Sequence, residues 1–310
     1  MGTRVAQPQP LSWREKTGRW FHRHRHVIKG YSFLSPYILF FLIFWLFPLL
    51  YAFWLSFHEF ETLYEAPRLV GLQHFRTMLT DRLFIGSFGN AGKYMLVQIP
   101  LTLILSLLAA LALNNLPFLK GFFRTVFFVP NVVSLIVVAV LFTSLYSPSM
   151  GLINYYLGKL GIPRQQFLNS PKTAMQSIAL MDVWRGVGFY TVVFLAGLQN
   201  IAREYYEAAL IDGANSLQQM LKITIPLMNP TIVLAVVLNC IWGFQIFMQP
   251  FLMTAGGPLN STWTPVYLLY RESFQYLRLG YGTAMGIVLT VIILIVTVIQ
   301  RRIVEREVNY

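Results

Sequence analysis

Charged side chains are scarce in this 310-residue chain, where Asp, Glu, Lys and Arg together make up only 12% of the residues. A soluble globular domain has about a quarter of its residues charged, and these residues cover its surface. Apolar residues make up 56% of the chain, and its mean hydropathy is +0.56. The shortage of charge excludes an ordinary soluble domain and predicts an integral membrane protein.

Cysteine and histidine are also rare. The single cysteine, Cys240, excludes an intramolecular disulfide and a metal site built on several thiolates. All five histidines lie before residue 75 and outside the long apolar segments, so these segments lack the ligands of a haem or a zinc protease site. Neither an H-E-x-x-H motif nor a phosphate-binding P-loop occurs. We therefore expect a non-catalytic chain that binds no cofactor or metal, with any nucleotide chemistry on another chain.

Acidic side chains are nearly absent from the apolar segments, where Asp182 is the only one well inside. Proton-coupled carriers depend on several ionisable residues within their membrane helices. A secondary carrier is therefore the less favoured alternative for this chain.

Six apolar segments have the length that a bilayer requires, which is about 20 residues for a helix that crosses about 30 Å of hydrocarbon. Backbone amides in lipid must bond within their own segment, so we expect an all-α fold of six transmembrane helices. Six crossings place both termini on the same side of the membrane. The predicted spans are 34–57, 93–114, 126–146, 174–198, 229–253 and 283–299.

The distribution of basic residues predicts the orientation. Outside the spans, Lys and Arg number 14 on the side of the termini and eight on the opposite side. Because an excess of basic residues marks the cytoplasmic side, we expect both termini in the cytoplasm. We favour this explanation of the net charge of +12 over binding to nucleic acid.

These predictions divide the chain into a basic cytoplasmic tail (1–33), a transmembrane domain (34–304) and a short cytoplasmic end (305–310). In the tail, basic residues alternate with Trp20 and Phe21. A solvated tail that sets the orientation is the favoured interpretation, and an amphipathic segment on the lipid of the inner leaflet is the alternative.

The cytoplasmic loop 201–226 has the pattern of a helix–turn–helix. Arg203 and Glu207 stand four residues apart, which favours a first short helix. Asp212 and Gly213 form a dipeptide that is typical of turns. The loop is therefore more ordered than a simple linker.

The second helix of this loop is expected to begin at a capping box formed by Ser216 and Gln219, and to end before Pro226. Small side chains leave the backbone of the hairpin open to close approach by a partner. A hairpin packed only on its own bundle is the alternative. The small residues are Ala208, Ala209 and Ala214.

A family resemblance favours the first interpretation. Glu207-Ala208-Ala209, Gly213 and Ile223-x-Ile225-Pro226 follow the pattern E-A-A-x3-G-x9-I-x-L-P at six of its seven fixed positions, with Ile225 in place of leucine. The segment resembles the EAA loop of ABC importer permeases. Further stretches resemble the sugar-type branch, in the six-helix layout of lactose- and glycerol-phosphate-type members: Phe123–Asn131, Gly151–Tyr155, Phe194–Gln199 and Thr254–Pro258.

The resemblance implies a type I ABC importer in the cytoplasmic (inner) membrane of a bacterial or archaeal cell. It implies a second permease subunit, two ATPase subunits that bind ATP and Mg²⁺, and an extracytoplasmic solute-binding protein. The loop would be the coupling helix in a groove of one ATPase, where Glu207 pairs with a basic residue and Gly213 allows a left-handed turn. The alternative for Glu207 is a solvated pair with Arg203. The residues implied at this contact are Glu207, Ala208, Ala209, Asp212, Gly213, Ala214 and Pro226.

Polar residues of the fifth predicted span form a stripe that suits a sugar. At about 100° per residue, the four residues fall within an arc of about 120°. Amides bond hydroxyl groups, and an indole stacks on the C–H face of a sugar. Hydrogen bonding between helices is the alternative. The stripe consists of Asn239, Trp242, Gln245 and Gln249.

In the fourth span, Asp182 and Arg185 stand three residues apart and can pair, which reduces the cost of burying either charge. A structural ion pair is favoured, while contact of Arg185 with an anionic group or of Asp182 with a sugar hydroxyl is the alternative. Tyr190 lies about 80° round the helix from Asp182, and either lines the pathway or packs.

We therefore expect a permease for an oligosaccharide or sugar derivative, with a non-sugar solute as the alternative. By resemblance, the outer loop near the binding-protein contact contains Gly256, Gly257 and Pro258.

Overall fold

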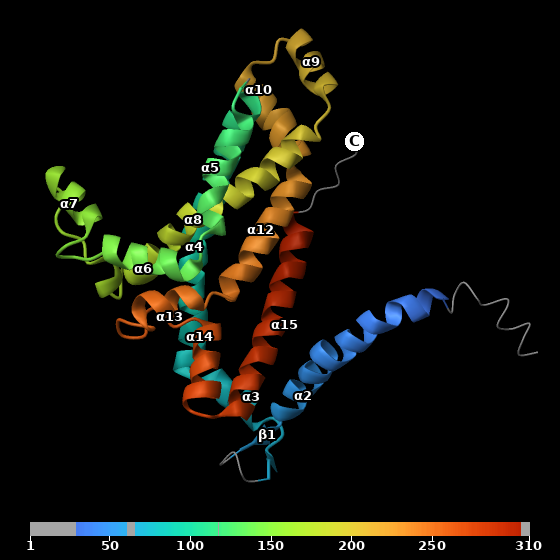
Figure 1. Cartoon of the computed structure of the whole chain (residues 1–310), viewed down its shortest axis with the longest axis vertical. Coiled ribbons are helices and arrows are strands. Elements are labelled where there is room, and N and C mark those ends of the chain that lie inside the picture. The colour runs from blue at the N-terminus through green and yellow to red at the C-terminus, as the bar shows by residue number, and fades with distance from the viewer. Residues whose placement is uncertain (1–28, 61–65, 117, 305–310) are drawn as a thin grey trace, which may run out of the picture. The chain divides into compact units, whose positions relative to one another are not determined.

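The structure is a computed structural model that describes residues 29–60, 66–116 and 118–304, with no side chain described at 304. The predictions for residues 1–28 and 305–310 lie outside the described residues. The described chain is mostly helical, with a short antiparallel ribbon of β1 (His58–Glu59) and β2 (Arg68–Leu69) (Figure 1). Its contacts divide it into two units, Met1–Trp54 and Leu55–Tyr310.

The described part of the first unit, residues 29–54, is one apolar helix. It belongs to a helix that runs over Lys29–Leu55, 27 residues long, and that begins five residues before the predicted first span. A π-helical turn, η1 (Leu42–Leu46), precedes α2 (Phe47–Leu55). The most apolar stretch of this helix buries no residue. A helix that is apolar on every side requires lipid or another protein around it.

The second unit is built around long helices. The longest, α4 (Arg82–Asn115), has 34 residues and extends about 51 Å at 1.5 Å per residue. It begins 11 residues before the predicted second span because Asp81 caps it, its Oδ1 accepting from the backbone N–H of Leu83 at 2.8 Å. The other long helices are α8 (Ala174–Gln199), α12 (Asn229–Phe244) and α15 (Leu279–Val304).

Helix α8 lies at the centre of the second unit, where it packs along α4 and against α5 (Lys120–Val132). Gly188 makes the second contact possible, since a Cβ at this position would collide with the backbone of Phe127. Close approach of backbones at a glycine is a common way to pack helices in membranes.

The third predicted span, 126–146, is not one continuous helix. It is formed by the end of α5 and by α6 (Leu135–Leu145), which meet at an angle of 88°. Val133 is extended between them. Helix α5 continues through Pro130 to Val132, so the proline, which disturbs the turn before it, does not explain the break that follows.

The fifth predicted span, 229–253, also differs from the structure. Helix α12 ends at Phe244, and α13 (Met248–Thr254) begins after a short irregular segment. The hydroxyl of Thr264 donates to the carbonyl of Ile246 at 2.6 Å, so a side chain from another segment satisfies a backbone group that the bend leaves free.

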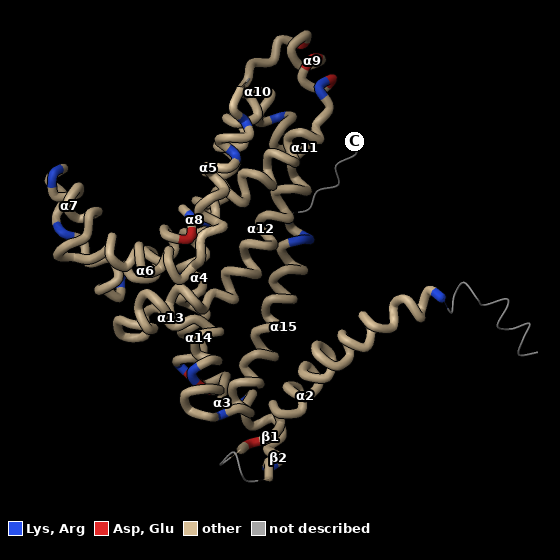
Figure 2. Tube along the Cα trace, in the orientation of Figure 1, with Lys and Arg blue, Asp and Glu red and all other residues tan. Residues whose placement is uncertain are grey.

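Within the described residues, four helices are long and apolar enough to cross a membrane. The count reaches six when each of two bent pairs is taken as one span: Lys120–Val132 with Leu135–Leu145, and Ser216–Leu227 with Asn229–Phe244. In the second unit, α9 (Arg203–Ile211) and α10 (Ser216–Gln219) lie at one end. The middle is largely free of charge (Figure 2).

Shorter helices complete the second unit, and α3 and α14 lie at the end opposite α9 (Figure 1). They are α3 (Gln73–Thr80), α7 (Leu152–Lys159), η2 (Phe167–Asn169), η3 (Met220–Thr224), α11 (Ile225–Leu227), α14 (Pro265–Tyr270) and η4 (Arg271–Gln275).

Candidate functional site

A cavity of about 690 Å³ is lined by residues of α4, of α8 and α12, of the α5–α6 bend and of the segment around α13. Its volume lies within the range of about 300–1,000 Å³ that is usual for small-molecule sites. All seven residues predicted on the solute pathway line it: Asp182, Arg185, Tyr190, Asn239, Trp242, Gln245 and Gln249. The prediction that Gln245 and Gln249 share one helical face with Asn239 and Trp242 is wrong, because α12 ends at Phe244, before these two glutamines.

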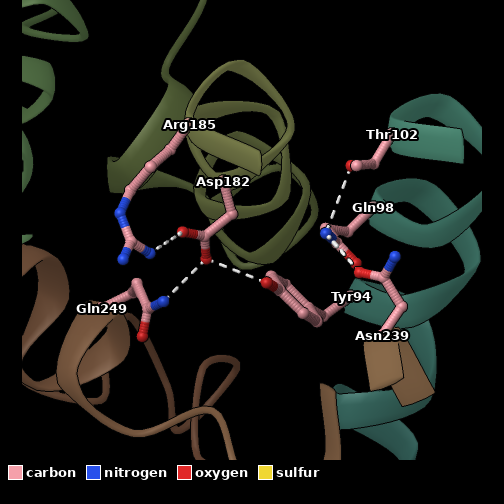
Figure 3. Close-up of polar contacts among 7 residues, drawn as sticks. All are labelled: Tyr94, Gln98, Thr102, Asp182, Arg185, Asn239 and Gln249. Atoms are coloured by element: carbon pink, nitrogen blue, oxygen red, sulfur yellow. Dashed lines mark hydrogen bonds and ion pairs between the residues drawn. The ribbon is translucent and has the colours of Figure 1, made fainter. Parts of the chain in front are cut away.

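The carboxylate of Asp182 is the centre of a polar network that joins α4, α8 and α13 (Figure 3). Its Oδ2 accepts a hydrogen bond from the hydroxyl of Tyr94 at 2.8 Å and another from Nε2 of Gln249 at 2.8 Å. Nη1 of Arg185 lies 3.8 Å from its Oδ1, so the predicted ion pair is confirmed, although it is too long to be a hydrogen bond. The Asp182 side chain is 5% exposed.

A second polar contact joins α4 to α12. Nε2 of Gln98 donates to Oδ1 of Asn239 at 3.1 Å and to the hydroxyl of Thr102 at 3.2 Å. The carbonyl side of the Asn239 amide is therefore used between helices, as the alternative for this residue predicted. Its amino group is not used in this way.

One wall of the cavity is aromatic. The ring of Trp242 lies 5.7 Å from that of Phe189 and 6.3 Å from that of Tyr190, measured between centroids. Tyr190 is buried, whereas Trp242 is 50% exposed. The indole is thus held on one side by other rings, and part of its surface stays open to a ligand.

Four buried polar atoms of the cavity-lining residues have no hydrogen-bond partner in the described chain. They are Oδ1 of Asp182, Nε of Arg185, the hydroxyl of Tyr190 and Nδ2 of Asn239. Leaving such a group unpaired costs about 1–3 kcal/mol. These atoms have almost no solvent-exposed surface, so a solute can pair with them only when the cavity changes its conformation. Their gathering around one cavity favours a binding site of that kind.

Sequence reasoning missed three polar residues that line the cavity: Tyr94, Gln98 and Asn131. Tyr94 and Gln98 stand four residues apart in an apolar segment, and this spacing was a usable signal for one polar helix face. Tyr94 falls at the end of the predicted span 93–114, whereas α4 begins at Arg82 and places Tyr94 within the helix.

The predicted helix–turn–helix is present as α9 and α10. Gly213 follows α9 with φ +78°, which confirms the left-handed turn. The N–H of Ala214 donates to the carbonyl of Ala209 at 2.8 Å, and that of Gly213 to Leu210 at 3.1 Å. These two bonds are the Schellman motif, which closes a helix at a glycine.

Two details of the second helix correct the sequence prediction. The capping box is formed by Asn215 and Gln218, one residue earlier than predicted, with both reciprocal bonds at 2.9 Å. The helix does not end before Pro226 but continues to Leu227, after a π-helical turn that directly precedes Ile225. This π-helical turn ends with the N–H of Ile225 donating to the carbonyl of Met220.

The hairpin holds itself together and leaves its tip open. The hydroxyls of Tyr206 and Thr224 are hydrogen-bonded at 2.9 Å. Glu207 is exposed, and no ion pair joins it to Arg203 among the described residues. Ile211 is 87% exposed. The tip therefore combines an unpaired acid with apolar surface, which is suited to contact with another protein.

The loop that contains Gly256, Gly257 and Pro258 is tightly ordered around its glycines. Gly256 has φ +82°, and a Cβ there would collide with the indole of Trp263. The Gly257–Pro258 peptide bond is cis. The hydroxyl of Thr262 donates to the carbonyl of Gly257 at 3.0 Å.

Residues 102–309 match the family described as binding-protein-dependent transport system inner membrane component. The chain belongs to this family. It is therefore a permease subunit of an ABC transporter, as the EAA pattern predicted, and it is embedded in a membrane.

Several members of this family are similar along nearly the whole chain. The arabinooligosaccharides transport system permease protein AraP of Bacillus subtilis (strain 168) is 34% identical over 88% of this chain and 87% of its own length. A solved bacterial ABC transporter involved in the import of the acidic polysaccharide alginate matches with a TM-score of 0.80 at 25% identity, covering 94% of this chain and 100% of its own. A bacterial alginate ABC transporter in complex with an alginate pentasaccharide-bound periplasmic protein matches with a TM-score of 0.78 at 27% identity, over the same shares. These matches confirm the predicted helical ABC importer permease fold, while the number of six spans depends on taking each bent pair as one span.

Proposed function

We propose that this permease subunit belongs to an ATP-driven, binding-protein-dependent importer that moves an oligosaccharide or sugar derivative by alternating access. The observation that carries the proposal is the cavity, where amides and a half-exposed indole lie beside unpaired buried polar atoms. The arabinooligosaccharide and alginate relatives support a sugar as the solute.

Different residues of the cavity would bind different parts of the sugar. Trp242 offers an apolar face to the C–H surface of a sugar ring. Asn239, Gln245 and Gln249 provide amides that hold hydroxyl groups, and Tyr190 provides a hydroxyl that can donate or accept.

Energy for transport comes from separate ATPase subunits that bind ATP and Mg²⁺, one of which receives the hairpin of α9 and α10. The exposed carboxylate of Glu207 and the exposed apolar side chain of Ile211 at the tip of the hairpin support this docking. Closure of the ATPases would push the hairpin and rotate the bundle. The contact consists of Glu207, Ala208, Ala209, Asp212, Gly213, Ala214 and Pro226.

The remaining partners are a second permease subunit and an extracytoplasmic solute-binding protein, which the Gly256–Pro258 loop meets. The relative solved with a periplasmic protein supports the binding-protein partner. The chain would lie in the cytoplasmic membrane of a bacterium or archaeon, with both termini in the cytoplasm. A non-sugar solute is the second candidate for the same machinery.

Reconstitution in vesicles tests the proposal. The chain, assembled with its second permease, ATPase and binding protein, is expected to accumulate a labelled neutral oligosaccharide only with ATP. Glu207→Lys is expected to abolish uptake while the permease pair still inserts. Uptake without the ATPase would identify a secondary carrier, and normal uptake by Glu207→Lys would overturn the docking assignment.

A further inference from the structure

The charges around the cavity are few and balanced. Of all the described residues that line it, only Asp182 and Arg185 carry a charge. They have opposite signs and lie 3.8 Å apart, so this chain contributes no net charge to the cavity.

The Asp182 carboxylate is fixed in place. Tyr94 from α4 and Gln249 from α13 both donate to its Oδ2, and its side chain is 5% exposed. A charged group held by several donors in a buried site does not move away without leaving those donors unpaired. Any solute in the cavity therefore lies beside a fixed pair of Asp182 and Arg185.

The unpaired atoms show which chemistry suits this arrangement. Arg185 Nε and Asn239 Nδ2 can only donate, Oδ1 of Asp182 can only accept, and the Tyr190 hydroxyl can do both. These atoms are buried in the present conformation. Because a hydroxyl group both donates and accepts, hydroxyls of a sugar can pair with either kind of atom once the conformational change of alternating access uncovers them. A carboxylate or phosphate that bonds to Arg185 would instead face the Asp182 oxygen, which has no proton to share and repels it.

We propose, on the basis of the sugar-import function above, that this cavity selects an uncharged, hydroxyl-rich glycan and rejects uronates and sugar phosphates. Asp182 is the residue that sets this selection, and Tyr94 and Gln249 are positioning residues that hold it. The fold alone does not decide this property, since a relative of the same fold imports an acidic polysaccharide.

The experiment uses the full importer in vesicles with two groups of probes, which are neutral trisaccharides such as maltotriose and arabinotriose, and the acidic trisaccharide trigalacturonate. The wild type is expected to take up a neutral probe at least tenfold faster than trigalacturonate. Asp182→Asn, which leaves Arg185 unbalanced, is expected to lower neutral uptake at least tenfold and to narrow the gap between the two groups.

The double variant Asp182→Asn/Arg185→Gln restores a cavity without net charge and is expected to recover part of the neutral uptake. Lys172→Gln, an exposed charge change away from the cavity, is the matched control and is expected to behave as wild type. Assembly of each variant is checked by size-exclusion chromatography.

Trigalacturonate uptake by the wild type that Arg185→Gln abolishes would overturn the inference and leave the sugar-import function standing. Equal loss in the single and double Asp182 variants would also overturn it, since charge balance would then not matter. Failure of every trisaccharide, with ATP-driven uptake of a non-sugar solute, would overturn the proposed function and the inference together.

Discussion

At the scale of single residues, the candidate site depends on side chains that are buried yet not fully satisfied. Asn239 illustrates this, because its carbonyl accepts from Gln98 while its amino group has no partner among the described residues. Trp242 shows the opposite case, because its indole packs on the ring of Phe189 at one side and is half exposed at the other. The Asn239 carbonyl holds α4 and α12 together, whereas the exposed part of the Trp242 indole is open to a solute.

Replacing Trp242 separates these roles. Trp242→Ala is expected to lower the uptake of a neutral oligosaccharide by about tenfold, because the loss of an aromatic contact of about 0.5–1.5 kcal/mol and of apolar surface weakens binding. Trp242→Phe keeps an aromatic face and is expected to retain most of the uptake. Copurification of the ATPase should be unchanged in both. A variant that fails to assemble would show that the indole is a packing residue.

At the scale of elements, the hairpin of α9 and α10 is a self-supporting unit. Gly213 closes the first helix, the reciprocal bonds of Asn215 and Gln218 start the second, and Tyr206 joins the two through Thr224. A rigid hairpin transmits a push at its tip to the helices that follow, whereas a flexible loop would absorb it.

Gly213 provides a test of this rigidity. Gly213→Pro is expected to abolish uptake, because proline fixes φ near −65° and removes the N–H that bonds to Leu210. Gly213→Ala is expected to weaken coupling only moderately, by the roughly 1–2 kcal/mol that a left-handed L-residue costs, since no atom lies within 4 Å of the added Cβ. The ratio of solute transported to ATP hydrolysed measures both effects. Full coupling in the proline variant would contradict the assignment.

The segment around η4 at the opposite end of the second unit is expected to respond to pH. Burial raises the pKa of Glu272 above its ordinary value, and the ion pair with Arg278 at 3.3 Å offsets this effect only in part. A carboxyl group with a raised folded-state pKa stabilises the fold below its unfolded pKa, and this contribution is lost as pH rises through the folded pKa.

The melting temperature of the wild type relative to Glu272→Gln is therefore expected to fall as pH rises from 4 to 8. Glu204→Gln, which removes an exposed acid on α9, is the matched control for the loss of a carboxylate. A difference for Glu272→Gln that grows with pH would show that the ion pair with Arg278 outweighs burial.

At the scale of the whole molecule, the second unit depends on close contacts between helices. Gly188 on α8 lies against the backbone of Phe127 and Phe128 on α5. This contact holds α5 beside α8, and the α5–α8 pair carries several residues that line the cavity.

Gly188→Ala is expected to destabilise the protein by about 1–3 kcal/mol, because the added Cβ forces two backbones apart. Gly89→Ala is the matched control on α4, where no atom lies within 4 Å of the new Cβ, and it should be neutral or slightly stabilising. Thermal unfolding of the purified chain in detergent measures both. Equal melting temperatures for the two variants would contradict the close packing of α5 on α8.

The amino-acid sequence by itself determined the membrane character, the apolar helices, the hairpin with its turn at Gly213, and the family. These features are local: apolar length, helical spacing and turn chemistry act within a few tens of residues. The ion pair of Asp182 and Arg185 was predictable for the same reason, since one turn of helix brings the two side chains together.

Only the tertiary structure decided which residues come together to form the cavity. Tyr94 and Asp182 are 88 residues apart and Gln98 and Asn239 are 141 apart, and no local pattern specifies such pairs. The end of α12 at Phe244 also depends on a distant residue. The hydroxyl of Thr264, from a later segment, donates to the carbonyl of Ile246 in the bend that follows α12. Packing against distant residues determines where a helix bends and which polar groups meet, because buried backbone and side-chain groups must find partners wherever the fold supplies them.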